Sequence, residues 1–202
     1  MNKSFIIKII VLCLVTIKVS AIEKVILFGD SLMAGYGLPN EQHLSVVLQN
    51  NLSLDGHNIE IINGSVSGST SAGGLNIAEW TLSEPSIDLM ILCLGANDML
   101  RGINPKETKN NLEEIIKIAK SKNIKVIIAG MIAPTSYGYG YKKSFDKIFS
   151  DLSKKYKLQL IPFLLEGVAQ KPEFNLSDGM HPNDQGTIII GNTLKKAILE
   201  NL

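Results

Sequence analysis

The chain has few of the residues that cross-link a protein or give it a strong charge. Its 202 residues include two cysteines, one tryptophan and a single arginine, Arg101, and its 20 basic residues are nearly balanced by 19 acidic ones. The chain therefore lacks the excess of positive charge that is typical of proteins that bind nucleic acid or an anionic membrane surface. Glycine (17) and proline (7) are too few for a collagen-like or low-complexity chain. The length suits one globular domain whose core needs neither disulfide nor metal.

The first 21 residues have the pattern of a cleaved export signal. Lys3 and Lys8 precede an apolar stretch over 9–17, and small residues end the segment at Ala21. Nine residues of helix rise about 14 Å, less than half of a hydrocarbon layer roughly 30 Å thick. We therefore expect a signal peptide at 1–21 and a single exported domain at 22–202. That domain would be periplasmic or secreted, with no stable membrane insertion after cleavage.

Cleavage after Ala21 would change the totals for the chain. The mature form would have 181 residues, a net charge of −2 from 17 basic and 19 acidic residues, and Cys93 as its single cysteine. It could form no internal disulfide. Because Cys93 lies within the apolar run 89–94, we expect it to be a buried hydrophobic residue.

Beyond residue 22, short apolar runs alternate with longer amphipathic segments. The runs lack the polar alternation of a one-sided sheet and predict parallel strands buried on both faces, at 24–28, 59–62, 87–94, 126–130 and 158–161. Apolar residues at helical spacing predict helices between and after them, one of which has Asn104 and Pro105 as its start signal. The pattern predicts an α/β domain with a parallel sheet covered on both faces.

The chemistry of such a domain is expected in the loops at the carboxyl ends of its strands. Gly29-Asp30-Ser31-Leu32 follows the first predicted strand, and Asp178-Gly179-Met180-His181-Pro182 precedes the last predicted helix. A serine nucleophile needs a base to take its proton, and an imidazole base needs a carboxylate to orient it. Ser31, His181 and Asp178 are the candidates, although Ser31 taken alone is more often a helix N-cap.

Acyl transfer also needs hydrogen-bond donors for the oxyanion. Gly68, in the loop after the second predicted strand, could offer an unobstructed backbone N–H, and Asn97, after the third, could offer its side-chain amide. Taken singly, a loop glycine is more often a turn residue and a loop asparagine more often a cap. The Ser31 loop, Gly68, Asn97 and the loop of Asp178 and His181 occur in this order along the chain, each after a predicted strand. This arrangement favours the catalytic interpretation.

Together these motifs resemble the SGNH or GDSL hydrolase family, and the segments 28–39 and 162–169 are similar to its exported arylesterase, thioesterase and lysophospholipase branch. At residues 133–134 this chain has Ala133-Pro134, where members of the family often have Pro-Pro. The resemblance implies a three-layer α/β/α flavodoxin-like fold with about five parallel strands. It also implies a lipolytic enzyme with Ser31 as nucleophile, His181 as base and Asp178 as its orienting partner. The Ser31 N–H, the Gly68 N–H and the Asn97 amide would form the oxyanion hole.

Two loops on the expected catalytic edge are candidates for substrate binding. They could line an acyl groove or merely cap the sheet, and the residues singled out are Met99, Leu100, Ile103, Pro134 and Tyr137. The three histidines show no clustered ligand spacing, and phosphate-loop and dinucleotide motifs are absent, so we expect neither metal nor cofactor. No Gly-x-Ser-x-Gly elbow occurs, which disfavours the α/β-hydrolase superfamily.

The leading hypothesis is therefore an exported, monomeric serine esterase that acts on small acyl esters, thioesters or lysophospholipids and binds no nucleic acid. A carbohydrate O-acetylesterase of the same family is the first alternative. The second is a non-catalytic flavin-binding module, which Asp30 disfavours because it would repel a phosphate in the first loop. Asp30 and Asp98 are expected to support their loops by hydrogen bonding.

Overall fold

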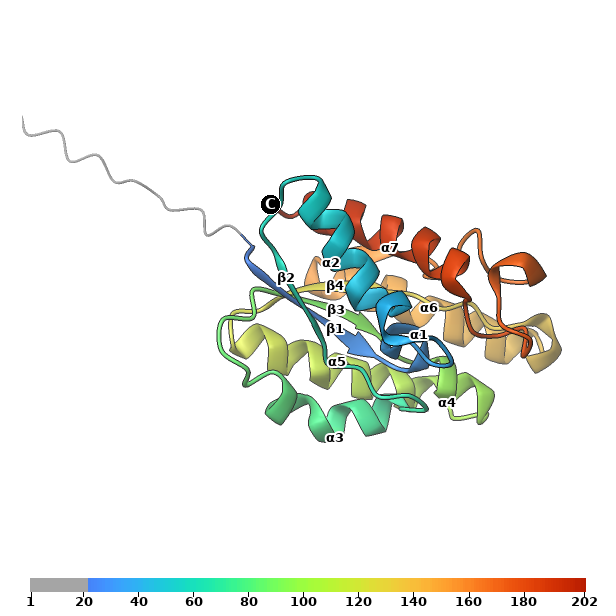
Figure 1. The fold of residues 1–202 in the computed structure, drawn as a ribbon. Coiled ribbons are helices and arrows are strands. Elements are labelled where there is room, and N and C mark those ends of the chain that lie inside the picture. The colour runs from blue at the N-terminus through green and yellow to red at the C-terminus, as the bar shows by residue number, and fades with distance from the viewer. Residues whose placement is uncertain (1–21) are drawn as a thin grey trace, which may run out of the picture.

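Residues 22–202, the part of the chain that the computed structural model describes, form a parallel sheet between two layers of helices (Figure 1). The five strands pair in the order β2-β1-β3-β4-β5, and their bounds are β1 Lys24–Gly29, β2 Glu60–Asn63, β3 Leu89–Cys93, β4 Lys125–Ala129 and β5 Gln159–Ile161. The predicted five-stranded α/β/α fold is confirmed. The expected signal peptide at 1–21 lies outside the described residues.

The long helices divide between the two faces of the sheet. On one face α2 (Leu44–Leu54) packs against α7 (Asp184–Leu199); on the other, α5 (Pro105–Ser121) lies between α3 (Ser71–Thr81) and α6 (Tyr139–Tyr156). Two short helices, α1 (Ser31–Ala34) and α4 (Ala96–Leu100), follow β1 and β3 almost directly. Single 3₁₀ turns occupy Asn40–Gln42, Thr135–Tyr137 and Pro172–Phe174. No helix within 22–202 has the length and apolarity needed to cross a membrane.

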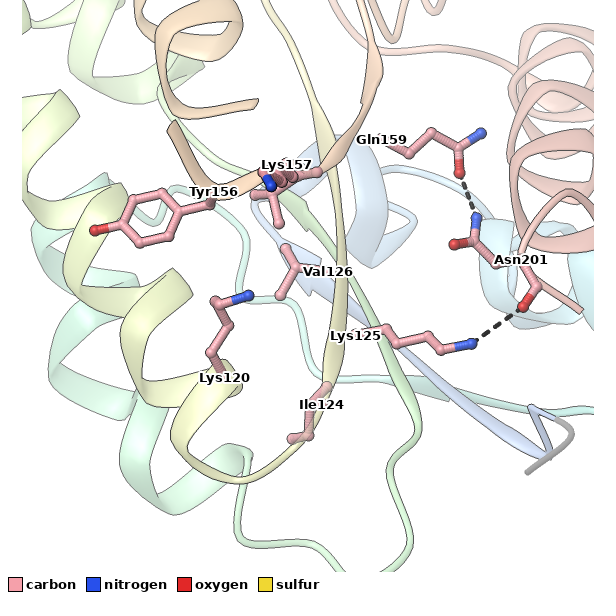
Figure 2. A pocket seen from close by; sticks show the side chains of 9 residues that line it. Lys120, Ile124, Lys125, Val126, Tyr156, Lys157, Gln159 and Asn201 are labelled. Atoms are coloured by element: carbon pink, nitrogen blue, oxygen red, sulfur yellow. Dashed lines mark hydrogen bonds between the residues drawn. The ribbon is translucent and has the colours of Figure 1, made fainter. Parts of the chain in front are cut away.

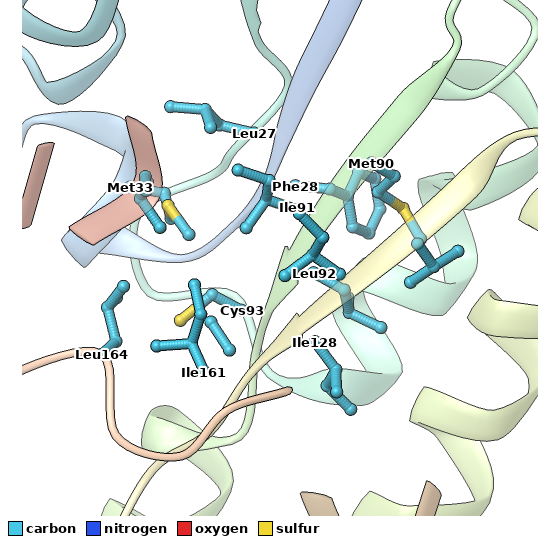
Figure 3. Packing of buried hydrophobic residues seen from close by; sticks show 14 of the residues in the cluster. Leu27, Phe28, Met33, Met90, Ile91, Leu92, Cys93, Ile128, Ile161 and Leu164 are labelled. Atoms are coloured by element: carbon cyan, nitrogen blue, oxygen red, sulfur yellow. The ribbon is translucent and has the colours of Figure 1, made fainter. Parts of the chain in front are cut away.

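The centre of the core is formed by β1 and β3. Every residue of β3 is buried, as is every residue of β1 after Lys24, because helices cover both faces. Figure 3 shows these side chains packed together with residues from β4, α1 and the segment after β5, among them Phe28, Leu92, Ile128, Met33 and Leu164. The absence of polar alternation in the sequence is thus explained.

The start of α5 also follows from the sequence. Asn104 is its N-cap, and the side-chain oxygen of this residue accepts the backbone N–H of Lys106 at 2.9 Å. Pro105 occupies the first turn, where its missing N–H costs nothing.

Gly29 closes β1 where the backbone of the neighbouring strand comes very close. A Cβ at this position would lie 2.6 Å from the carbonyl oxygen of Cys93 and 2.8 Å from Cγ of Met33. Only a residue without a side chain lets β1, β3 and α1 meet in this way, so the glycine is needed for space.

We therefore expect Gly29→Ala to lower the free energy of unfolding by about 1–3 kcal/mol, the usual range for overpacking a core, in urea denaturation. Gly140→Ala is the matched control, because a Cβ there, near the start of α6, would meet nothing within 4 Å. The control should be as stable as the original protein or slightly more stable. Equal stability of the two variants would contradict the close approach.

Candidate active site

The candidate catalytic residues meet at the carboxyl edge of the sheet. Ser31 begins α1 directly after β1, Asn97 lies in α4 just after β3, and Gly68 lies in the loop that joins β2 to α3. Asp178 and His181 come from the loop before α7. Because all strands are parallel, these loops leave the sheet at the same edge.

A continuous chain of hydrogen bonds joins three of these side chains. The Oγ of Ser31 lies 2.9 Å from Nε2 of His181, and Nδ1 of the same ring lies 2.6 Å from Oδ2 of Asp178. With its proton on Nδ1, the imidazole donates to Asp178 and accepts the serine hydroxyl on Nε2. This is the geometry that a nucleophile, its base and an orienting carboxylate require.

Asp178 is held in its charged form by the loop around it. Its Oδ1 accepts the backbone N–H groups of Met180 at 2.8 Å and His181 at 3.0 Å, and its Oδ2 faces the imidazole. Partial burial on its own would raise the pKa of this carboxyl, but the hydrogen bonds outweigh it and lower the pKa to about 2. Asp178 is therefore ionised at any pH where the protein would work.

Asp30 has the opposite environment. Only 1% of the residue is exposed; its Oδ1 accepts the N–H of Leu32 at 3.1 Å, and its Oδ2 lies 3.4 Å from Nδ2 of Asn97. Burial raises the pKa of this carboxyl to about 6, although both hydrogen bonds oppose the shift. Asp30 thus supports two loops, its own and that of Asn97.

Asp98 anchors α4 to the helices beside it. This fully buried carboxylate accepts the N–H and the hydroxyl of Ser71 at 2.7 and 2.5 Å, and the hydroxyl of Thr108 at 3.1 Å. The amide of Asn111 donates in turn to the Ser71 hydroxyl at 3.0 Å. The network ties the short helix that carries Asn97 to both α3 and α5.

Gly68 has a backbone conformation that favours glycine. Its φ is +78°, while a Cβ there would meet nothing within 4 Å, so conformation and not space requires a glycine at this position. The Gly68 carbonyl accepts a hydrogen bond from Nη2 of Arg101 at 3.1 Å. The single arginine of the chain therefore links the loop of Gly68 to the end of α4.

The five candidate substrate residues are placed differently from one another. Leu100 is exposed next to Arg101, whereas Met99 packs against the core. Ile103 is half-buried, and its carbonyl accepts the hydroxyl of Tyr141 at 3.0 Å. Pro134 and Tyr137 follow β4, which is separated from β1 by β3. Met99 and Leu100 belong to α4, whose end Arg101 links to Gly68, and Leu100 is the exposed one of the two.

Three further apolar side chains stand at the same edge, and the sequence did not single them out. The ring of Tyr36 lies 4.4 Å from that of His181, centroid to centroid, Met180 adjoins the histidine, and Val66 precedes Gly68 in its loop. Each is about half exposed. Although Tyr36 and Met180 lie within segments that resemble the family, nothing in the sequence marks these residues for substrate binding, because exposed apolar residues become notable only once the loops are brought together.

A cavity at the opposite edge of the sheet has no serine, histidine or carboxylate among the described residues that line it. This cavity of about 180 Å³, at the amino ends of β4 and β5, is lined by residues that include Lys120, Lys125 and Lys157 (Figure 2). There the Lys125 ammonium and the Gln159 side chain both bond to Asn201. Within residues 22–202 no three His, Cys, Asp or Glu side chains gather as metal ligands would.

A three-layer parallel α/β fold with a Ser-His-Asp hydrogen-bond chain at the carboxyl edge of its sheet is characteristic of a class of serine hydrolases. Within that class, the chain belongs to the GDSL-like lipase/acylhydrolase family, whose model matches residues 27–187. The family resemblance seen in the sequence is confirmed.

Individual relatives match nearly the whole chain. An arylesterase from Vibrio mimicus is 36% identical over 182 residues, 90% of this chain and 91% of the relative. The thioesterase 1/protease 1/lysophospholipase L1 of Escherichia coli is 30% identical over 187 residues, 93% of this chain and 88% of that protein. A crystal structure of TesA is similar with a TM-score of 0.84 and 31% identity, covering 89% of this chain and 100% of the other.

The environment of Asp30 predicts a pH-dependent stability. Its pKa of about 6 lies above the ordinary 3.8, so the folded protein binds this proton more tightly than the unfolded chain. The Asp30 carboxyl therefore lowers the free energy of unfolding as pH rises from 4 through 6. The asparagine of Asp30→Asn does not titrate, so the variant escapes this loss. The free energy of unfolding of the variant minus that of the original protein should therefore increase between pH 4 and pH 8, by up to about 3 kcal/mol in urea denaturation. A stability difference that does not change with pH would contradict this prediction.

Proposed function

We propose that this protein is an exported serine esterase that hydrolyses small acyl esters and thioesters through an acyl-enzyme on Ser31. The observation that carries the proposal is the hydrogen-bond chain from Ser31 Oγ to Nε2 of His181, at 2.9 Å, and from Nδ1 to Asp178, at 2.6 Å. Membership of the lipase/acylhydrolase family and the names of the relatives support the same reaction.

In the acylation step, Ser31 Oγ forms a bond to the carbonyl carbon of the substrate while its proton passes to Nε2 of His181. The imidazole becomes positively charged, and the ionised Asp178 stabilises that charge from the other side of the ring. The tetrahedral intermediate collapses as the leaving alcohol or thiol takes the proton from Nε2. The products of this half-reaction are the free alcohol or thiol and an ester on Ser31.

The oxyanion of that intermediate needs donors on the face away from His181. The backbone N–H groups of Ser31 and Gly68 and the side-chain amide of Asn97 supply them in this proposal. Gly68 presents its N–H in a loop with no Cβ to obstruct a substrate, and Asn97 stands on α4, which Asp98 anchors.

Deacylation repeats these steps with water in place of serine. Nε2 of His181 takes a proton from water, whose oxygen bonds to the acyl carbon. The second tetrahedral intermediate then collapses, its bond to Ser31 Oγ breaks, and the proton returns from Nε2 to that oxygen. The carboxylic acid leaves and the free enzyme is restored.

The surroundings of the site favour an apolar acyl group over a sugar acetate. Tyr36, Val66, Leu100 and Met180 each expose about half of an apolar side chain. Leu100 ends the helix that carries Asn97, Tyr36 follows the helix that Ser31 begins, and the other two lie in the loops of Gly68 and His181. Such side chains can bury an acyl chain but offer few hydrogen bonds to the hydroxyls of a carbohydrate. The substrate is thus a small acyl ester, thioester or lysophospholipid.

The nucleophile is tested with Ser31→Ala and a short p-nitrophenyl ester. Since the hydroxyl forms the covalent bond, kcat should fall by about 10⁴-fold or more while circular dichroism remains unchanged. Ser150→Ala is the matched control, because among residues 22–202 this hydroxyl bonds to the Lys147 carbonyl alone, on the surface of α6. Turnover by Ser31→Ala within tenfold of the original enzyme would exclude Ser31 as nucleophile.

Export is proposed on the sequence of residues 1–21. Expressed from the full sequence in a bacterium, the protein should be recovered outside the cytoplasm as a 181-residue chain that begins at Ile22. Intact-mass measurement of that fraction checks the cleavage site. A protein that keeps Met1 and remains in the cytoplasm would contradict export.

A further inference from the structure

The side chain of Asn97 is directed by a residue that the mechanism above does not use. Within residues 22–202, Asn97 Nδ2 donates a hydrogen bond to Asp30 Oδ2, and the two atoms are 3.4 Å apart, a long distance for such a bond. The two residues are 67 positions apart, but they follow adjacent strands, and the register pairs Gly29 with Cys93 at the strand ends. The carboxylate therefore lies beside the amide because β1 is next to β3.

The two ends of an asparagine amide have opposite hydrogen-bonding roles. Its nitrogen carries two N–H donors and its oxygen only accepts, so the partner beside it decides which way the group points. An ionised carboxylate can only accept, and it would repel the amide oxygen. Next to Asp30, the Asn97 amide is thus held with its nitrogen toward the carboxylate, so one N–H bonds to Asp30 Oδ2 and the second N–H can serve another acceptor.

The two buried aspartates at this edge, Asp30 and Asp98, contact different parts of the segment that carries Asn97. Asp98 bonds to Ser71 and Thr108 and so fixes the backbone of α4. Within residues 22–202 it makes no hydrogen bond to the Asn97 side chain, so it does not restrain the rotation of that amide. Asp30 supplies that missing restraint.

Building on the proposed function, we propose that Asp30 is a positioning residue: its carboxylate orients the Asn97 amide so that one N–H points at the oxyanion. The Leu32 N–H, which bonds to Oδ1, fixes the carboxylate itself. Because a negative charge near an oxyanion is unfavourable in itself, the benefit of Asp30 must come through orientation. The nearly complete burial of Asp30 keeps water from competing for its carboxylate.

The proposal is tested first with Asp30→Asn and Asp30→Ser. Asparagine can offer its own N–H to the Asn97 oxygen and so favours the reversed amide, whereas serine can still cap α1 but is too short to reach Asn97. With a short p-nitrophenyl ester, both variants should lose about 10- to 100-fold in kcat with little change in KM, since removal of one oxyanion donor costs about 10²–10³-fold. Asp30→Ser keeps the test open if Asp30→Asn does not fold.

A double-mutant cycle with Asn97→Ala then separates orientation from general structural support. Asn97→Ala alone should lose about 10²–10³-fold in kcat. If Asp30 acts through Asn97, adding Asp30→Asn to Asn97→Ala should lower kcat by no more than about twofold further. A multiplicative loss in the double variant would overturn the proposal, because Asp30 would then act on another part of the site.

Asp88→Asn is the control for replacing a carboxylate that accepts backbone N–H groups. Asp88 accepts those of Glu23 and Lys24, at 2.8 and 3.0 Å, at the amino edge of the sheet, and its variant should keep the original kcat. Full activity of Asp30→Asn and Asp30→Ser beside an impaired Asn97→Ala would overturn this proposal alone. Full activity of Asn97→Ala would instead overturn the oxyanion assignment on which it rests.

Discussion

The pairing of β1 with β3 is the constraint on which the rest of the site depends. Both strands are buried on two faces, so their position is fixed by the core, and their ends deliver Ser31 and Asn97 to the same edge. The close approach at Gly29 removes the space that a side chain would need and brings α1 against the end of β3. The sheet therefore sets where the residues of the site lie, and the segments that follow its strands add the reactive groups.

Two aspartates show how one residue type takes two roles through its surroundings. Asp178 is partly exposed and is surrounded by N–H donors, which keep its pKa at about 2 and its charge available to a positive imidazole. Asp30 is buried with fewer donors, so its pKa rises to about 6. Burial without enough hydrogen bonds destabilises a charge. At Asp30 this destabilisation accompanies the contact by which the carboxylate restrains the Asn97 amide.

Much of this could be read from the sequence because the signals are local. Uninterrupted apolar runs gave the five strands, and a serine, a glycine, an asparagine and an Asp-x-x-His pair after strand ends indicated a hydrolase. The contact between Asp30 and Asn97 could not be predicted from the residues alone, because it depends on which strands are neighbours. The same holds for Tyr36 against His181: the sequence shows an aromatic residue near a serine but not its distance from a loop near the other end of the chain.

The bond between Ser31 and His181 joins residues 150 positions apart. It closes a loop that contains four of the five strands, and closing so long a loop in an unstructured chain carries a large entropic cost. The nucleophile therefore meets its base only in a chain whose sheet holds the two loops together. Reactivity is in this sense a property of the finished fold, and a chain that is still unfolded carries a serine no more reactive than any other.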